Sequence, residues 1–215
     1  TVVAVLAGGI AELVPSLLAT PAQEVINAEA KPYRPLELEG RDVYIREGCY
    51  GCHSQMIRTF TFESKRYGEP STMGESVYDH PFQWGSKRTG PDLAREGGKY
   101  PALWHYRHMM DPREVSPGSI MPPYTALATD KVDASVTPAK MRAMRSIGVP
   151  YEAGQIALAE VDEAAQAREI ADALRKDGAE VDPRSEVVAL IAYLQRLGVH
   201  PQPAPGAPVQ VSLAK

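Results

Sequence analysis

Apolar positions along much of this 215-residue chain recur with the three- and four-residue spacing of amphipathic helices. The clearest stripe falls in residues 38–47, where Val43 and Tyr44 stand among charged residues and Gly48 follows as a helix-ending signal. Gly40, one turn before Tyr44, leaves a bare patch that a second helix can approach closely. This segment therefore predicts a helix on which another helix packs.

Four further segments have a helical pattern, and glycine or proline stands near the end of each one. They are residues 102–110, 137–148, 152–176 and 182–198. The second and third of these predict a helical hairpin. The fourth has a predicted buried side consisting of Val187, Val188, Leu190, Ile191, Leu194 and Leu197. Together the segments predict a mainly α fold.

The amino-terminal residues 1–19 are apolar apart from Glu12. A membrane span requires about 20 such residues, and the chain does not begin with Met. We therefore expect residues 1–19 to be the C-terminal part of an N-terminal transmembrane helix, with a secretory signal or a buried core helix as alternatives. Glu12 lies near the end of the run, where a carboxylate can reach the membrane interface or a partner helix.

The rest of the chain divides into a tether at 20–37, one domain at 38–198 and a proline-containing flexible tail at 199–215. Two insertions are expected within the domain, at about 54–88 and 125–181. Long ordered loops are usually functional. Four aromatic residues predict a small core within the first insertion: Tyr67, Tyr78, Phe82 and Trp84.

The formal net charge is −4 and the pI is about 5.8, which argues against nucleic acid as a partner.

The chain has two cysteines, and both fall in the sequence Cys49-Tyr50-Gly51-Cys52-His53. C-x-x-C-H is the spacing of a c-type haem attachment site, in which two thioethers hold the porphyrin and the histidine is an axial iron ligand. A redox dithiol is an alternative, but it is usually part of a βαβ unit, and the flanking pattern here is helical. Half of a zinc site would need two more soft ligands. The motif predicts one covalently attached haem c.

The turn Gly90-Pro91-Asp92-Leu93 is suited to support the axial histidine, because the Pro91 carbonyl can accept the Nδ1–H of His53. Lys87 and Arg88 precede this turn and are candidates for ion pairs with the haem propionates, with plain surface charge as the alternative.

Met121 lies in the proline-rich stretch 116–124 and is the best candidate for the sixth iron ligand, since a rigid loop can present its thioether. His105 or His108 would instead give bis-histidine ligation. Met109 and Met110 share a predicted helix, where packing is the commoner use of methionine.

The order of these elements resembles class I cytochrome c. Gly40-x-x-x-Tyr44-x-x-x-Gly48-Cys49 resembles the first-helix signature, and Pro117-Gly118-x-x-Met121 resembles the ligand loop. Tyr193-Leu194 resembles part of the closing helix that crosses the first. The resemblance implies a class I cytochrome c fold, here with two insertions, in which Met121 is the sixth ligand.

Residues 40–58 and 78–95 are more specifically similar to the mono-haem subunit (subunit II) of cbb(3)-type cytochrome c oxidases. The resemblance implies a periplasmic domain, anchored by one helix in the bacterial inner membrane and docked on the catalytic haem–copper subunit. Electrons would arrive from a di-haem cytochrome c subunit and pass to the low-spin haem b. Oxygen reduction and proton pumping would take place in the catalytic subunit.

Three alternatives remain at this point. The anchored cytochrome c subunit of a nitric oxide reductase shares the anchor and the haem, but the insertion at 78–95 favours the oxidase. A haem-based sensor would need an open sixth position. A free soluble carrier is disfavoured by the apolar start.

Overall fold

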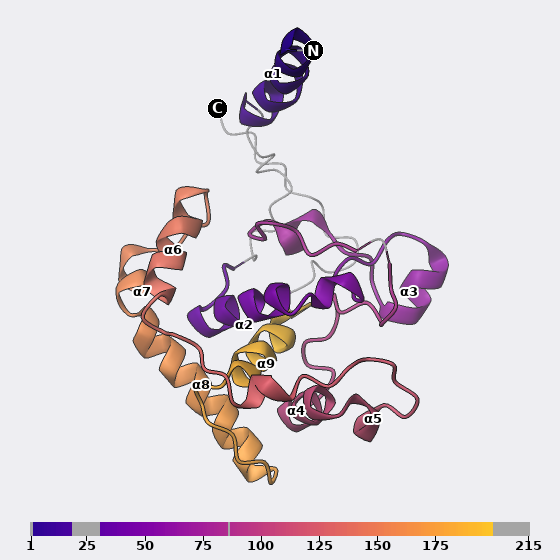
Figure 1. The fold of residues 1–215 in the computed structure, drawn as a ribbon, viewed down its shortest axis with the longest axis vertical. Coiled ribbons are helices and arrows are strands. Elements are labelled where there is room, and N and C mark those ends of the chain that lie inside the picture. Colours follow the sequence, from indigo (N-terminus) through magenta and orange to yellow (C-terminus); the bar gives the residue numbers. More distant parts are fainter. Residues whose placement is uncertain (1, 19–30, 86, 200–215) are drawn as a thin grey trace, which may run out of the picture.

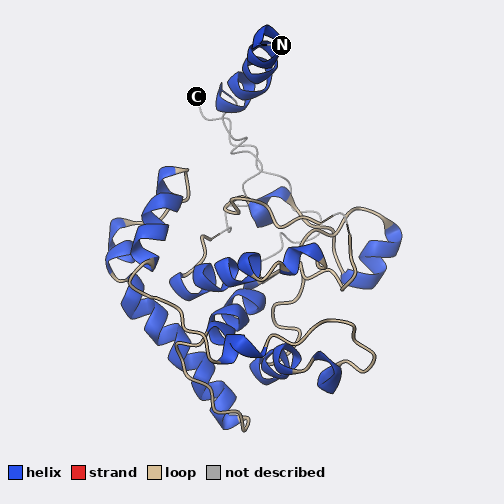
Figure 2. Cartoon of the chain, in the orientation of Figure 1, coloured by secondary structure: helices blue, strands red, loops and turns tan. Residues whose placement is uncertain are grey.

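The computed structural model describes residues 2–18, 31–85 and 87–199, and within these ranges the chain is helical and contains no strand beyond one isolated bridge (Figures 1 and 2). The α-helices are α1 (Val2–Leu18), α2 (Pro35–Arg46), α3 (Thr61–Tyr67), α4 (Ala102–Met110), α5 (Pro112–Val115), α6 (Thr137–Ser146), α7 (Ala153–Ala157), α8 (Ala159–Lys176) and α9 (Glu186–Arg196). Short 3-10 turns are η2 (Cys49–Gly51), η3 (Met73–Ser76) and η4 (Thr125–Ala128). The predicted mainly α fold is confirmed.

Helices α2 and α9 cross at the centre of the molecule and form its most extensive helix pair (Figure 1). Gly40 makes the crossing close: a Cβ at this position would collide with the carbonyl oxygen of Ala189 and would lie 2.8 Å from the Cβ of Tyr193. The Tyr44 ring packs on the Tyr193 ring, with their centroids 5.4 Å apart. The bare patch at Gly40 is thus occupied by a crossing helix, as predicted.

Helix α9 is buried more completely than its sequence pattern indicates. The pattern predicts one buried side, whereas every residue from Glu186 to Leu194 is buried. The reason is that α2, α4 and α8 all pack against this helix. A helix enclosed in this way must be apolar around most of its circumference.

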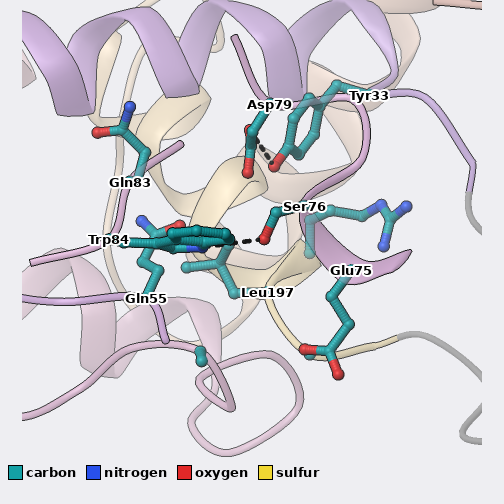
Figure 3. Close-up of a pocket in the computed structure, with 11 residues that line it drawn as sticks. Tyr33, Gln55, Glu75, Ser76, Asp79, Gln83, Trp84 and Leu197 are labelled. Atoms are coloured by element: carbon teal, nitrogen blue, oxygen red, sulfur yellow. Dashed lines mark hydrogen bonds between the residues drawn. The ribbon is translucent and has the colours of Figure 1, made fainter. Parts of the chain in front are cut away.

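The aromatic core predicted for the first insertion does not form. Phe82 and Trp84 stack on one another, with centroids 4.4 Å apart, and are 50% and 42% exposed. Polar contacts lie at the centre of this region instead. Asp79 accepts hydrogen bonds from the Tyr33 hydroxyl (3.0 Å) and from Arg41 Nε (2.9 Å), beside a pocket of about 30 Å³ (Figure 3).

The second insertion forms the predicted helical hairpin, with α6 on one side, α7 and α8 on the other, and a break at Leu158. The hairpin is joined to α2 by Thr137, whose Oγ1 lies 2.8 Å from Glu39 Oε1 and 2.7 Å from Glu163 Oε2. The Thr137 hydroxyl has one proton and can donate it to either carboxyl group. Glu39 also accepts from Lys140 Nζ at 2.6 Å. Burial raises the pKa of Glu163, whose carboxyl accepts from the Thr137 hydroxyl.

Two observations concern the amino-terminal part of the chain. Among the described residues no helix is both long and apolar enough to cross a membrane. The predicted tether at 20–37 includes the first turn of α2, because Pro35 suits the first helical position and Glu37 accepts the Arg34 N–H at 2.8 Å. The Glu12 side chain, residues 19–30 and most of the predicted tail lie outside the described residues.

Gly40→Ala is expected to lower the free energy of unfolding by about 1–3 kcal/mol or more, because the new methyl group meets backbone at the α2–α9 crossing. Gly154→Ala is the control, since nothing lies within 4 Å of a Cβ at that helical position. The control should be neutral or stabilise by up to about 1 kcal/mol. Denaturant unfolding measures both values, and equal values would contradict the close crossing.

Glu163→Gln is expected to remove a pH dependence. The folded state holds the Glu163 proton more tightly than the unfolded chain, in which a glutamate has a pKa of about 4.3. The stabilisation is therefore complete below that pH and is lost as the pH rises through the higher folded-state pKa. The amide oxygen of glutamine can still accept from Thr137, so the variant should gain stability relative to wild type as the pH rises above about 4. Parallel stability–pH curves would refute the raised pKa of Glu163.

Candidate haem site

The C-x-x-C-H motif follows directly from the C-terminal end of α2. Gly48 has a φ of +72°, a left-handed conformation that glycine adopts without strain. In η2 the N–H groups of Cys52 and His53 both donate to the Cys49 carbonyl, at 3.1 and 2.9 Å. Because α2 is fixed by its crossing with α9, its end fixes where the two thiols and the imidazole lie.

The His53 ring is held by the segment 89–93. Its Nδ1 lies 2.8 Å from the Pro91 carbonyl oxygen and donates to it, so Nε2 is left to face a metal. A Cβ on Gly90 would collide with the ring, whose Nδ1 and Nε2 would both be 2.8 Å away. The Gly90 N–H donates to the Cys52 carbonyl at 2.9 Å, which ties the segment to the motif. Burial lowers the pKa of His53, which keeps the ring neutral.

The C-x-x-C-H motif lines a cavity of about 490 Å³. Cys49, Cys52 and His53 line it, and so does Met121 from the loop between α5 and η4. Residues of α4 and α9 complete the wall. The volume lies within the range of about 300–1,000 Å³ that is typical of cofactor sites. The pocket in Figure 3, at about 30 Å³, has room for little more than water.

The loop that carries Met121 is held by its own hydrogen bonds. The Met121 N–H donates to Ser119 Oγ at 3.2 Å, and the Ser119 N–H donates to the Ser116 carbonyl at 3.0 Å. Beyond the loop, the Tyr124 N–H donates to the Met109 carbonyl of α4 at 2.7 Å. Met121 packs partly buried against the main core. The loop therefore presents the thioether from a fixed backbone.

Helix α4 contributes two histidines to the cavity wall. His105 is 1% exposed, and neither its Nε2 nor the Nδ1 of His108 has a hydrogen-bond partner within the described structure. Trp104 stacks between Tyr100 and His108, with centroid distances of 3.9 and 4.7 Å. Burial lowers the pKa of His105 to about 4, so this ring is neutral near pH 7. Sequence reasoning considered the histidines only as alternative iron ligands. Their i, i+3 spacing places both side chains on one face of α4, and this spacing was the signal that they share the cavity.

Lys87 and Arg88 are not brought to the cavity, contrary to the expectation that they contact propionates. Arg88 Nε lies 3.0 Å from the Asp92 carboxylate, and its guanidinium lies 2.7 Å from the Glu63 carboxylate. Lys87 is exposed. A cation that does line the cavity is Lys99. Arg88 thus forms its ion pairs with Asp92 and Glu63. Its position in the sequence gave no indication of the ion pair with Glu63.

The alternative uses of the cysteine pair find no support in the geometry. A redox dithiol needs a thiol with a depressed pKa, whereas burial and the nearby Glu47 carboxylate raise the pKa of Cys49 to about 12. In the described ranges no three or more His, Cys, Asp or Glu side chains are grouped as a metal site would require. The described residues therefore give no support to a reactive Cys49 thiol or to a zinc site at the motif.

Comparison with models of known protein families gives a match over residues 1–200, to the family described as "Cytochrome C oxidase, mono-heme subunit/FixO". The chain belongs to the FixO family. It is thus a cytochrome c oxidase subunit, and the family indicated by the sequence motifs is confirmed. A search of the curated proteins finds no match.

Gly90→Ala is expected to push the His53 ring away from Pro91, because the added methyl group would overlap the ring. A crystal structure of the variant should show an Nδ1–O separation well beyond the 2.8 Å of the wild type. Gly51→Ala is the control from the same motif, since nothing lies within 4 Å of its Cβ. An unchanged separation in Gly90→Ala would contradict the close packing of the ring.

Proposed function

We propose that this chain is a membrane-anchored mono-haem c-type cytochrome of a cbb(3)-type terminal oxidase. In the proposed role it relays electrons from a di-haem cytochrome c subunit to the low-spin haem b of the catalytic haem–copper subunit. The observation that carries the proposal is that Cys49, Cys52, His53 and Met121 line a single cavity in a chain of the FixO family. Aerobic respiration, with oxygen reduced to water and protons pumped, would be the work of the whole complex.

The residues around the cavity fit a covalently attached haem. The two cysteines supply the thioether linkages on one wall, and His53 presents a neutral, oriented imidazole. The unpartnered Nε2 of His105 is a buried polar group that requires a hydrogen-bond partner, and a haem propionate can be that partner. Lys99 lies at the same wall and complements negative charge.

The proposed axial pair is His53 and Met121, and the haem, when bound, supplies a one-electron iron couple. His53 donates through Nδ1 to Pro91, which fixes the ring and raises its basicity as a ligand. The Met121 thioether favours the reduced state and raises the potential. No substrate has to enter, so the cavity wall only needs to hold both ligands steady and exclude water.

The helix arrangement supports a class I cytochrome c fold with insertions at about 54–88 and 125–181. The first helix of the domain carries the motif at its end and crosses the closing helix at Gly40. The Met121 loop follows α4, and α9 lines the cavity through Leu190 and Leu194.

The proposed location is the bacterial inner membrane, with the cytochrome domain in the periplasm and residues 1–19 in the anchor. The first part of α1 supports an apolar environment, since the following side chains are 59–79% exposed: Val2, Val3, Val5, Leu6 and Ile10. Such a surface suits lipid or a partner helix. The proposed partners are the catalytic subunit and the di-haem subunit.

Family membership favours the oxidase over the cytochrome c subunit of a nitric oxide reductase. Beyond His53, four further thioether or imidazole side chains share the cavity wall in the described structure, namely Met109, Met121, His105 and His108. This supply of ligands argues against the open sixth position that a haem sensor requires, and it leaves bis-histidine ligation as the alternative for experiment.

Met121→Ala is expected to lower the midpoint potential of the haem by roughly 100 mV or more, because the axial ligand is the largest determinant of potential. The reduced variant should also bind carbon monoxide at the vacated position. Redox titration and reduced-minus-oxidised spectra of the membrane-purified complex measure both effects.

Met141→Ala is the matched control, since Met141 is buried in a separate cluster with Leu38 and Val149. It should destabilise the domain without changing the haem spectrum. If Met121→Ala retains the wild-type potential and spectrum while His105→Gln or His108→Gln loses them, the sixth ligand is a histidine.

A further inference from the structure

The segment that supports His53 is itself anchored on the side away from the ring. Asp92 directly follows Pro91, and its buried carboxylate accepts three hydrogen bonds. The donors are Arg88 Nε (3.0 Å), the Met56 N–H (3.3 Å) and the Ala94 N–H (2.9 Å). The carboxylate next to the Pro91 carbonyl is therefore fixed to two other parts of the chain. The peptide unit that accepts from His53 cannot shift without disturbing these bonds.

Arg88 extends this anchorage into the first insertion. Its Nη2 lies 2.7 Å from Glu63 Oε2 and 2.7 Å from the Met56 carbonyl oxygen. Glu63, on α3, also accepts from the N–H and the Nε of Arg58, at 2.8 and 2.6 Å. The Glu63 and Asp92 carboxylates have no solvent exposure, and Arg88 is 14% exposed. The arginines hold the pKa of Glu63 well below its usual range, so the carboxylate stays ionised.

We propose that Arg88, Glu63 and Asp92 form a positioning clamp that fixes the Pro91 carbonyl against His53 Nδ1 and thereby sets the redox potential of the haem. The inference rests on the proposed function, since it concerns the axial histidine. It assigns a role to the first insertion, which supplies Glu63. Arg88 acts through the Pro91 carbonyl and not by contact with a propionate.

The direction of the effect follows from ligand chemistry. An imidazole whose Nδ1–H donates to a firmly held carbonyl is a stronger electron donor to the metal. Stronger donation stabilises ferric iron more than ferrous iron and lowers the potential. Loosening the clamp lengthens the Nδ1–O distance, weakens donation and raises the potential.

Charge alone predicts a different result, and this makes the proposal testable. Arg88→Gln removes a positive charge near the iron and would lower the potential by Coulomb's law, whereas Glu63→Gln removes a negative charge and would raise it. The clamp predicts that both substitutions raise the potential, because either one breaks the 2.7 Å contact between the two side chains.

The experiment is a redox titration of the purified complex carrying Arg88→Gln, Glu63→Gln or the conservative Arg88→Lys, which retains the charge but loses the two-pronged contact. The expected change in the ferrous-to-ferric ratio at fixed potential is on the order of tenfold, toward ferrous, with a smaller change for Arg88→Lys. The proton NMR signal of the axial histidine ring N–H should move toward a weaker hydrogen bond in the same variants.

Asp79→Asn is the matched control. It breaks another buried ion pair, between Arg41 and Asp79, whose side chains are 3% and 7% exposed. These two side chains also bond to the Tyr33 hydroxyl and to the Pro81 carbonyl. It should lower stability while leaving the potential and the ring signal unchanged. Opposite shifts in Arg88→Gln and Glu63→Gln, or shifts no larger than that of Asp79→Asn, would overturn the clamp. Should Arg88→Gln fail to fold, Arg88→Lys decides the question, because it keeps the charge: a raised potential supports the clamp, and an unchanged potential overturns it.

A failure of the proposed function is distinguishable from a failure of the clamp. It would appear in the wild type, as the absence of covalent haem or of histidine–methionine ligation.

Discussion

The close crossing of α2 and α9 at Gly40 is the constraint on which the rest of the molecule depends. It permits backbone contact at Ala189 and packs Tyr44 on Tyr193. The C-terminal end of α2 carries the cysteines and His53, while α9 supplies apolar wall to the same cavity. The geometry of the candidate site is thus fixed by helix packing, and its ligand residues need little local structure of their own beyond one 3-10 turn.

Polar contacts help to hold the two insertions to this helical centre, beside the apolar packing of the second insertion on α2 and α9. Thr137 joins the hairpin to α2, because its hydroxyl lies within hydrogen-bond distance of both the Glu39 and the Glu163 carboxyl groups. In the first insertion, Asp79 and Glu63 each accept from buried or half-buried arginines, and Phe82 and Trp84 stay at the surface. Buried ion pairs add less stability than apolar packing of the same volume, but they fix geometry because a broken pair is costly. Fixed geometry suits the first insertion, because in the proposed clamp its Glu63 helps to hold the Pro91 carbonyl against His53.

The sequence predicted what depends on local pattern. It identified α4 to the residue and the close approach at Gly40, and it indicated that Pro91 could accept from His53. It failed where partners are distant in the chain. Glu63 lies 25 residues before Arg88, and no periodicity indicates that the two side chains meet. The burial of every α9 residue from Glu186 to Leu194 was likewise missed, because the number of helices packed around α9 is a property of the tertiary fold.

The central claim is that His53 and Met121 are the axial ligands of one haem attached through Cys49 and Cys52. Near-infrared magnetic circular dichroism of the ferric protein, purified from membranes, tests this most directly, because the charge-transfer band distinguishes the axial pairs of a low-spin haem. The account predicts a low-spin histidine–methionine signal with one haem per chain. A bis-histidine signal, a five-coordinate signal or a chain without haem would contradict it.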